Sequence, residues 1–298
     1  MADTKKIIVV TGGAGFIGSH LCEALAKDPA NRVISLDNYF TGTKSNHVEG
    51  VEYREGHTKD IERHIPETPD IIYHLGEYSR VRQSFSEPEI TWDLNIKGTL
   101  GVLEFWRKHK CKLVYAGSST KFTEAREDGV EGRDLAPYTW AKAAMSDLVN
   151  NYGAWYGLPY VVVYFYNVYG PRELSNEYGT IVGIFKEQHK TGDPLTVASP
   201  GTQQRCFTHV EDTIKGIVLA SEKGKGDGYG IGADDCYSLL DIAEMFVSGQ
   251  AGGGEIKMLP QTKTTRSWNK TDSSKVEALG WKPKKTLKEY IESTKKNL

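Results

Sequence analysis

Residues 7–20 read IIVVTGGAGFIGSH, an apolar run that passes directly into a glycine-rich turn and then into an amphipathic segment. Gly12, Gly15 and Gly18 keep three places free of a Cβ atom: the turn, a ligand contact and the contact between helix and sheet. A pyrophosphate can approach such a turn and lie at the positive end of the helix dipole. Because strand, turn and helix follow one another here, the stretch predicts a dinucleotide-binding turn.

Short apolar runs recur along the chain and are expected to be buried strands, at residues 7–10, 32–36, 71–75, 112–115 and 160–164. Amphipathic stretches at 19–27, 92–109 and 141–156 are the expected helices. Alternation of this kind is typical of a parallel sheet covered on both faces. The expected fold class is therefore α/β: a Rossmann-type, doubly wound parallel sheet with a smaller C-terminal α/β substrate-binding lobe.

The pattern loosens after about Asn167, where glycine and proline become frequent. We expect residues 1–166 to form the dinucleotide-binding domain, with 209–235 returning to it. Residues 167–208 and 236–298 are then expected to form the smaller lobe.

The chain of 298 residues carries a formal net charge of −2, so it has no basic excess with which to hold a nucleic-acid backbone. Its mean hydropathy is negative and no apolar run approaches the length of a membrane span. The N-terminus leads into a strand without a signal-peptide pattern. The four cysteines lack metal-site or CxxC spacing, which predicts reduced, partly buried thiols, no metal and a cytoplasmic protein: Cys22, Cys111, Cys206 and Cys236.

Asp37 and Asn38 follow the second expected strand, about twenty residues beyond the glycine turn. An acid at that place accepts hydrogen bonds from the adenosine ribose and repels a 2′-phosphate, which favours NAD over NADP. The alternative is that Asp37 only begins a turn.

Tyr138 and Lys142 are four residues apart and share a helical face if the helix has begun by then; Pro137 is a suitable opener. A phenol with a pKa near 10 is a poor base at neutral pH, but a neighbouring ammonium and a cationic nicotinamide favour the phenolate. The strand before this pair ends in Gly117–Thr120, and the hydroxyls of that segment are expected where open α/β sheets bind their ligands. Each pattern alone is common in exposed helices or turns. Together they predict proton exchange with a substrate hydroxyl, with Ser118 orienting the substrate oxygen.

In this order the features resemble the extended short-chain dehydrogenase/reductase family, in particular its NAD-dependent nucleotide-sugar epimerase/dehydratase branch. The resemblance runs from residue 7 to about 283 and includes YFYNVYGPR at 164–172, QRCFTHVED at 204–212 and DSSKVEALGWKP at 272–283.

The resemblance implies a role for particular positions. The implied catalytic residues are Ser118, Tyr138 and Lys142. The implied contacts to the sugar nucleotide are Ser118, Tyr138, Asn167, Arg205 and Arg266. The implied NAD contacts are Gly12, Gly15, Phe16, Ile17, Gly18, Asp37, Asn38, Leu75, Gly76, Asn95, Tyr138 and Lys142. Arginine suits diphosphate because its planar fork donates to two oxygens at once, and a surface ion pair is the alternative for both arginines.

Several positions depart from the family pattern. His57 stands where an acid near the adenine is usual. Glu77 replaces a small residue, so that an acid faces either the cofactor or the sugar, and Phe165 replaces a tyrosine. The loop 123–134 and the segment 266–272 are shorter than the family pattern. The family residues that limit the size of the sugar therefore cannot be assigned to positions in this chain.

The residues after Ser118 narrow the reaction. They are Ser119, Thr120 and Lys121, whereas the dehydratases of the branch carry an acidic pair there and UDP-glucuronate decarboxylases a nearby glutamate. The fucose-synthase type needs a cysteine where Thr120 stands. The expected reaction is therefore epimerisation at C4 of a nucleotide-linked hexose, with UDP as the default nucleotide, a transient 4-keto sugar and tightly held NAD. The alternatives are an NAD(P)H-dependent 4-keto-sugar reductase and a non-catalytic NAD-binding regulator.

The expected partners are the nucleotide sugar and a second copy of the chain, with no nucleic acid and no membrane. The resemblance implies a homodimer in which segments 92–109 and 141–156 form a four-helix bundle. The apolar residues that would line it, or would equally serve as internal core, are Trp92, Leu100, Leu103, Trp106, Leu148 and Trp155.

Overall fold

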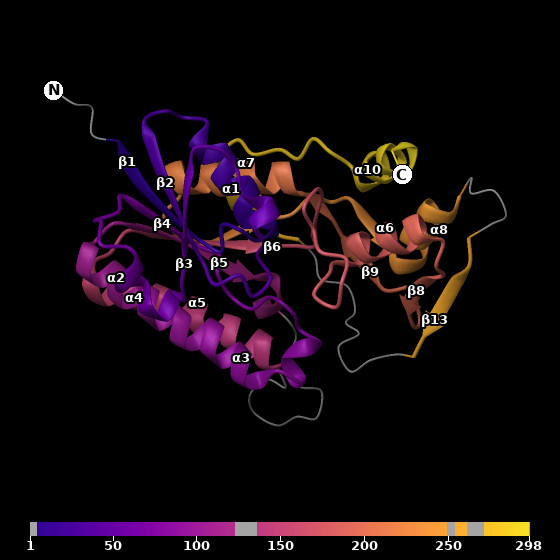
Figure 1. Ribbon diagram of the computed structural model, residues 1–298, viewed down its shortest axis with the longest axis horizontal. Coiled ribbons are helices and arrows are strands. Elements are labelled where there is room, and N and C mark those ends of the chain that lie inside the picture. The colour runs from indigo at the N-terminus through magenta and orange to yellow at the C-terminus, as the bar shows by residue number, and fades with distance from the viewer. Residues whose placement is uncertain (1–4, 123–135, 249–253, 261–270, 298) are drawn as a thin grey trace.

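The protein is represented by a computed structural model that describes residues 5–122, 136–248, 254–260 and 271–297. Its main feature is a seven-stranded sheet of order β11-β6-β5-β4-β1-β2-β3, in which every neighbouring pair is parallel. The strands are β1 Lys6–Thr11, β2 Asn31–Asp37, β3 Val51–Glu55, β4 Ile71–His74, β5 Lys112–Ser118, β6 Tyr160–Phe165 and β11 Gly226–Ile231. This order, with helices on both faces (Figure 1), confirms the predicted Rossmann-type α/β fold.

Alternating side chains of β1 divide the core into two layers. Ile8 and Val10 belong to the cluster that includes α1 and α7, and Val9 belongs to the cluster that includes α4 and α5. The helices packed on the sheet are α1 Phe16–Ala26, α2 Ile61–His64, α4 Gly98–His109, α5 Pro137–Tyr156, α7 Val210–Lys223 and α9 Ser274–Ala278, and the short helix α3 Pro88–Trp92 packs against α5. The predicted helix 92–109 is thus divided: a π-helical turn, Asp93–Lys97, joins α3 to α4.

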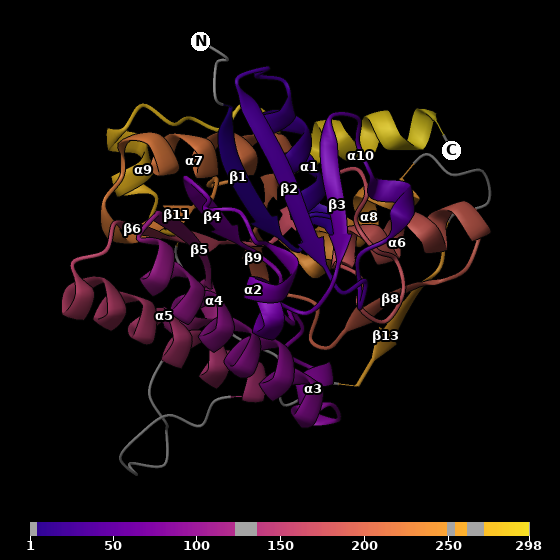
Figure 2. The same cartoon turned by 60° about the vertical axis from the view of Figure 1, so that its left-hand side comes forward.

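A second, smaller core lies at one end of the sheet (Figure 1). Phe185, Phe246 and Leu287 are fully buried in it. The elements around it are β7 Val168–Tyr169, α6 Ile181–Thr191, β8 Leu195–Ala198, β9 Gln204–Cys206, β10 Thr208–His209, β12 Cys236–Ser238, α8 Leu239–Val247, β13 Ile256–Leu259 and α10 Leu287–Lys296. The chain between α8 and α10 returns to the main sheet, where α9 lies beside α7 and β11 (Figure 2).

The cysteine prediction is wrong for two of the four residues. Cys206 on β9 and Cys236 on β12 lie opposite each other in an antiparallel pair and form a disulfide. Cys22 and Cys111 are buried free thiols, and burial raises the pKa of each to about 12. Sequence spacing could not reveal the bond because strand register, and not proximity in sequence, brings the two cysteines together.

The apolar residues considered for a dimer divide between core and surface. Leu103 and Trp106 on α4 are completely buried against the sheet, so they are internal core. Leu100 and Trp155 are 38% and 61% exposed. Within the described residues, no helix combines the length and the apolar character needed to span a membrane.

Candidate active site

A cavity of about 560 Å³ opens at the carboxyl ends of the central strands, and this size is in the range of small-molecule sites. The predicted site residues that line it are Gly12, Gly15, Phe16, Ile17, Gly18, Asp37, Asn38, Leu75, Gly76, Ser118, Tyr138, Lys142, Asn167 and Arg205. Arg266 lies outside the described residues. One cavity therefore gathers residues that lie far apart in the sequence, from Gly12 to Arg205.

The turn between β1 and α1 requires its glycines. Gly12 has φ +73°, and a Cβ there would lie 2.8 Å from the Cα of Gly76 at the end of β4. A Cβ on Gly18 would lie 2.0 Å from the carbonyl oxygen of Gly12. The N-cap of α1 is Gly15, which has no side chain to cover the first amides of the helix. The helix N-terminus is thus available to a phosphate group.

Asp37 ends β2 at the edge of this turn. Its carboxylate accepts hydrogen bonds from the amides of Ala14 at 2.9 Å and Tyr39 at 2.8 Å, while burial raises its pKa. Two backbone donors fix the carboxylate, which lines the cavity and keeps lone pairs for further donors. This arrangement suits the hydroxyls of a ribose.

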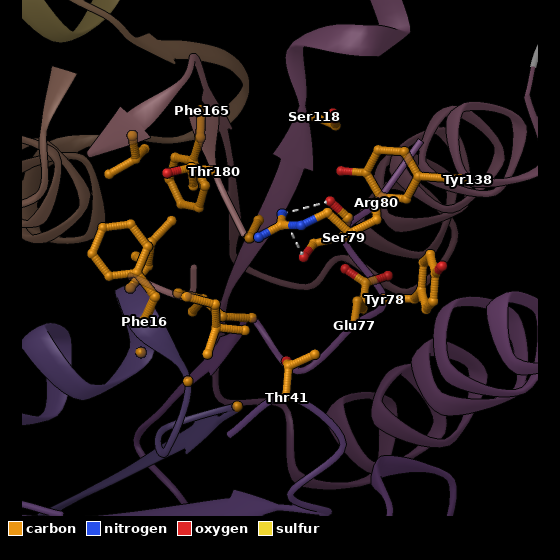
Figure 3. A pocket seen from close by; sticks show the side chains of 18 of the residues that line it. Phe16, Thr41, Glu77, Tyr78, Ser79, Arg80, Ser118, Tyr138, Phe165 and Thr180 are labelled. Carbon is orange, nitrogen blue, oxygen red and sulfur yellow. Dashed lines mark hydrogen bonds between the residues drawn. The ribbon is translucent and has the colours of Figure 1, made fainter. Parts of the chain in front are cut away.

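The predicted catalytic residues come from two elements. Ser118 ends β5, and its Oγ lies 3.0 Å from Thr120 Oγ1. Tyr138 begins α5, where its amide donates to Ser84 Oγ at 3.2 Å and its ring packs in a small cluster with Tyr78. The Tyr138 hydroxyl points into the same space as Ser118 (Figure 3). The two hydroxyls can thus meet one substrate oxygen.

Lys142, one turn after Tyr138, forms a buried ion pair with Glu77, and the two side chains are only 5% and 2% exposed. The same carboxylate accepts hydrogen bonds from the Tyr115 hydroxyl at 3.0 Å and the Thr99 hydroxyl at 2.9 Å. Lys142 also donates to the carbonyl of Ala116. Glu77, which the sequence left facing either cofactor or sugar, therefore faces the lysine and balances its charge.

The hydrogen-bond network continues behind Glu77 through His74. Thr11 Oγ1 lies 2.7 Å from His74 Nδ1, and His74 Nε2 lies 3.0 Å from Thr99 Oγ1. Burial lowers the pKa of His74 to about 4, so the ring is neutral. Because Thr11 Oγ1 already accepts the amide of Gly76 at 2.9 Å, it donates to Nδ1, and the ring donates through Nε2. The network fixes Glu77 from the side of the sheet.

Two residues linked to the cofactor by sequence lie elsewhere. Asn95 is fully buried in the π-helical turn and does not line the cavity. Its amide accepts the N–H of Tyr78 at 2.6 Å and donates to the carbonyl of the same residue at 3.0 Å. His57 pairs with Asp93 at 2.9 Å, also outside the lining. Asn95 thus holds the segment that carries the site and does not itself face the ligand space.

Arg80 is a lining residue that sequence reasoning missed. Its guanidinium points into the middle of the cavity between Tyr138 and Thr180 (Figure 3). Its Nη1 donates to the carbonyl and the hydroxyl of Ser79 at 3.0 and 3.2 Å. The sequence offered one indication of this role: Arg80 lies three residues after Glu77, where the chain departs from the family pattern.

The smaller lobe contributes the other predicted substrate contacts. Asn167 follows β6 with φ +20°, and its side chain donates to the carbonyl of Cys206 at 2.9 Å. Arg205 lies next to that cysteine on β9 and donates to the carbonyl of Gln204 at 2.7 Å. The disulfide to Cys236 therefore links the strand of Arg205 to β12.

An open helix N-terminus after β1, a buried acid after β2, and a tyrosine and lysine on α5 are together typical of a dinucleotide-dependent enzyme. The sequence profile of the NAD dependent epimerase/dehydratase family matches residues 8–232. The chain belongs to that family, and NAD, as predicted, is its cofactor.

Individual relatives cover nearly the whole chain. UDP-glucuronic acid decarboxylase 6 of Arabidopsis thaliana is 32% identical, over 95% of this chain and 86% of its own length. The structure of a UDP-glucose 4-epimerase from Thermotoga maritima with UDP-glucose superimposes with a TM-score of 0.88 at 27% identity, covering 97% of both chains. The structure of a UDP-glucuronic acid 4-epimerase from Bacillus cereus, in complex with UDP-glucuronic acid and NAD, superimposes with a TM-score of 0.82 at 27% identity. The match covers 97% of this chain and 98% of that one.

Proposed function

We propose that the protein epimerises the sugar of a nucleotide sugar at C4 through a transient 4-keto intermediate. The observation that carries the proposal is the chemistry of the cavity wall. Among the described lining residues the acids are Asp37, at the cofactor end, and Glu77, whose carboxylate is occupied by Lys142, Tyr115 and Thr99. Within the described lining, no acid is thus left at the sugar end for a dehydration, and the hydroxyls of Ser118 and Tyr138 suit proton exchange at one oxygen.

The chain's own residues divide the work. Tyr138 takes the proton of the sugar O4 and later returns it, and Ser118 holds O4 by a hydrogen bond. We assign Lys142, which lies one turn after Tyr138 and is paired with Glu77, as a donor to the nicotinamide ribose. NAD supplies a reversible hydride acceptor, so the oxidation at C4 is undone in the same cycle. Release of the 4-keto sugar between the two hydride transfers would end the cycle unfinished, which is why we expect the cavity to hold sugar and cofactor together.

The diphosphate of the sugar nucleotide is assigned to Asn167, Arg205 and Arg266, and UDP is the default nucleotide. The names of the relatives put both a neutral hexose and a uronic acid among the candidate sugars. Decarboxylation is the second candidate function, favoured by the Arabidopsis relative. An NAD(P)H-dependent 4-keto-sugar reductase uses the same triad but releases its cofactor at each turnover.

We also propose the division into an NAD-binding domain and a sugar-nucleotide lobe, with residues 274–281 counted with the sheet because Val276 and Trp281 pack in its core. A homodimer through α4 and α5 remains part of the proposal, with Leu100 and Trp155 as its exposed apolar residues. Sedimentation of the wild type and of Trp155→Ser tests the dimer, because loss of a dimer on this exposed substitution locates the interface.

The deciding experiment begins with a mass spectrum and an absorbance scan of the denatured, freshly purified protein. The protein is then incubated, without added cofactor, with UDP-glucose, UDP-galactose, their N-acetyl forms and UDP-glucuronate. Co-purified NAD and a product of equal mass but different retention support the epimerase. A product lighter by CO2 supports the decarboxylase, and an empty protein that consumes NAD(P)H on a 4-keto sugar supports the reductase. Tyr138→Phe is the matched inactive control.

A further inference from the structure

The charges on the cavity wall are unevenly compensated. The charged residues that line it are Asp37, Glu77, Arg80, Lys142 and Arg205. Asp37 is held by backbone amides at the cofactor end, and Glu77 and Lys142 neutralise each other. Arg205, on β9, is assigned to the diphosphate. Among these charged lining residues, Arg80 is therefore the cation at the sugar end for which a counterion has still to be identified.

The described partners of Arg80 are all neutral. They are the carbonyls of Tyr178 and Ser79 and the hydroxyl of Ser79, and no carboxylate of the described chain lies within ion-pair distance. Glu173 acts on Arg80 from farther away, but its carboxyl is bonded to the Thr180 hydroxyl, and burial raises its pKa to about 7. A partly buried cation of this kind is ordinarily paired.

The segment that carries Arg80 is held in place on both sides. The hydroxyls of Tyr78 and Tyr178 both donate to Glu87, at 2.7 and 2.6 Å. Asn95 binds both backbone groups of Tyr78. The guanidinium is thus presented to the cavity by a rigid support, as a built binding site requires, and its planar fork matches a carboxylate.

We propose that Arg80 binds a carboxylate on the sugar, so that the substrate is a nucleotide-linked hexuronate and not a neutral hexose. The inference rests on the proposed function, because that function places C4 of the sugar at Ser118 and Tyr138. In a hexuronate the carboxylate is attached to C5, the neighbour of C4, and Arg80 lies beside Tyr138 (Figure 3). Loss of CO2 from the 4-keto sugar would pass the C5–C6 electron pair to the C4 carbonyl oxygen. An ion pair with Arg80 stabilises the carboxylate anion but not neutral CO2, so it disfavours decarboxylation of the 4-keto sugar.

The test compares UDP-glucuronate with UDP-glucose on the NAD-loaded protein, by calorimetric binding and by steady-state kinetics. Arg80→Gln removes the charge, Arg80→Lys keeps it, and Arg82→Gln is the matched control, because Arg82 is exposed and outside the cavity. We expect Arg80→Gln to weaken UDP-glucuronate binding about 10- to 100-fold, the worth of a charge-assisted hydrogen bond, with UDP-glucose changed less than about threefold. Arg80→Lys should recover part of the loss, and Arg82→Gln should resemble the wild type.

Three results would overturn the inference. If Arg80→Gln weakens the binding of both sugar nucleotides equally, Arg80 binds the diphosphate. If the variant loses its co-purified NAD, Arg80 binds the cofactor. If the preference for UDP-glucuronate over UDP-glucose is unchanged, Arg80 has no part in recognising the sugar. A thermal melt separates these from misfolding. Because affinity and product formation are measured separately, selective binding with no isomer formed would retain Arg80 as the carboxylate site and reject only the epimerase.

Discussion

The two halves of the cavity are built in different ways. The cofactor half is made largely of backbone: the turn at residues 12–18 and the ends of β1, β2 and β4. The sugar half is made of side chains from segments far apart in the chain, among them Arg80, Tyr138 and Arg205. A site built from backbone depends on the fold, whereas a site built from side chains depends on single residues. The first half is accordingly common to a family, and the second decides what one member does.

The largest expected effect breaks the sugar half alone. Tyr138→Phe removes the hydroxyl that exchanges the O4 proton, and we expect sugar interconversion to fall about 10³-fold. Co-purified NAD should stay within twofold of the wild type, because the cofactor half is made of backbone. Turnover and the absorbance of released cofactor measure the two effects. Activity within tenfold of the wild type would remove Tyr138 from the chemistry.

Glu77→Gln tests the border between the halves. It leaves the ammonium of Lys142 buried without its counterion, so we expect the free energy of unfolding to fall by about 3 kcal/mol in urea titrations. Glu62→Gln, in an exposed pair with Lys108, is the control and should change little. Adding Lys142→Met to Glu77→Gln should recover stability. A double variant no more stable than the single one would mean that the ion pair is not the cause.

Gly18→Ala breaks the cofactor half. The new methyl would overlap the carbonyl of Gly12, so we expect a loss of about 2 kcal/mol in stability and the disappearance of co-purified NAD. Gly157→Ala is the control for backbone strain, because Gly157 has φ +63° but open space around it. That variant should lose about 1 kcal/mol and keep its NAD. Full NAD content in Gly18→Ala would show that the turn tolerates a side chain.

The smallest expected effect is on the pH dependence of stability, and it comes from Glu173. Burial raises the pKa of Glu173 to about 7 from its ordinary 4.5, so the folded state binds a proton that the unfolded state has released. The resulting stability is present below pH 4.5 and is lost as pH rises through 7. Glu173→Gln should therefore match the wild type near pH 4 and be the more stable of the two near pH 9. Parallel stability curves for the two proteins across this range would contradict the raised pKa.

Local patterns predicted the sheet and the cofactor half. The turn at residues 12–18 and Asp37 are each readable from a few consecutive residues, because their geometry is set by backbone and register. The partner of Glu77 could not be read, because Lys142 is brought to it only when β4 and β5 pair beneath α5. The same holds for the disulfide. The position of Asn95 outside the cavity lining could not be read either, because a polar residue near the cofactor strands can bind backbone as readily as ligand.

Asp212 on α7 joins two segments that lie far apart in the sequence. Its fully buried carboxylate accepts the amides of Lys284 and Lys285, 72 and 73 positions later, and Trp281 donates to its carbonyl at 2.8 Å. Helix α7 packs on α1, the helix that begins at the cofactor turn. Residues far apart in the sequence therefore support the helix that follows the cofactor turn. Contacts of such long sequence range slow folding, so we expect the turn to become fixed, and NAD to bind, late in folding.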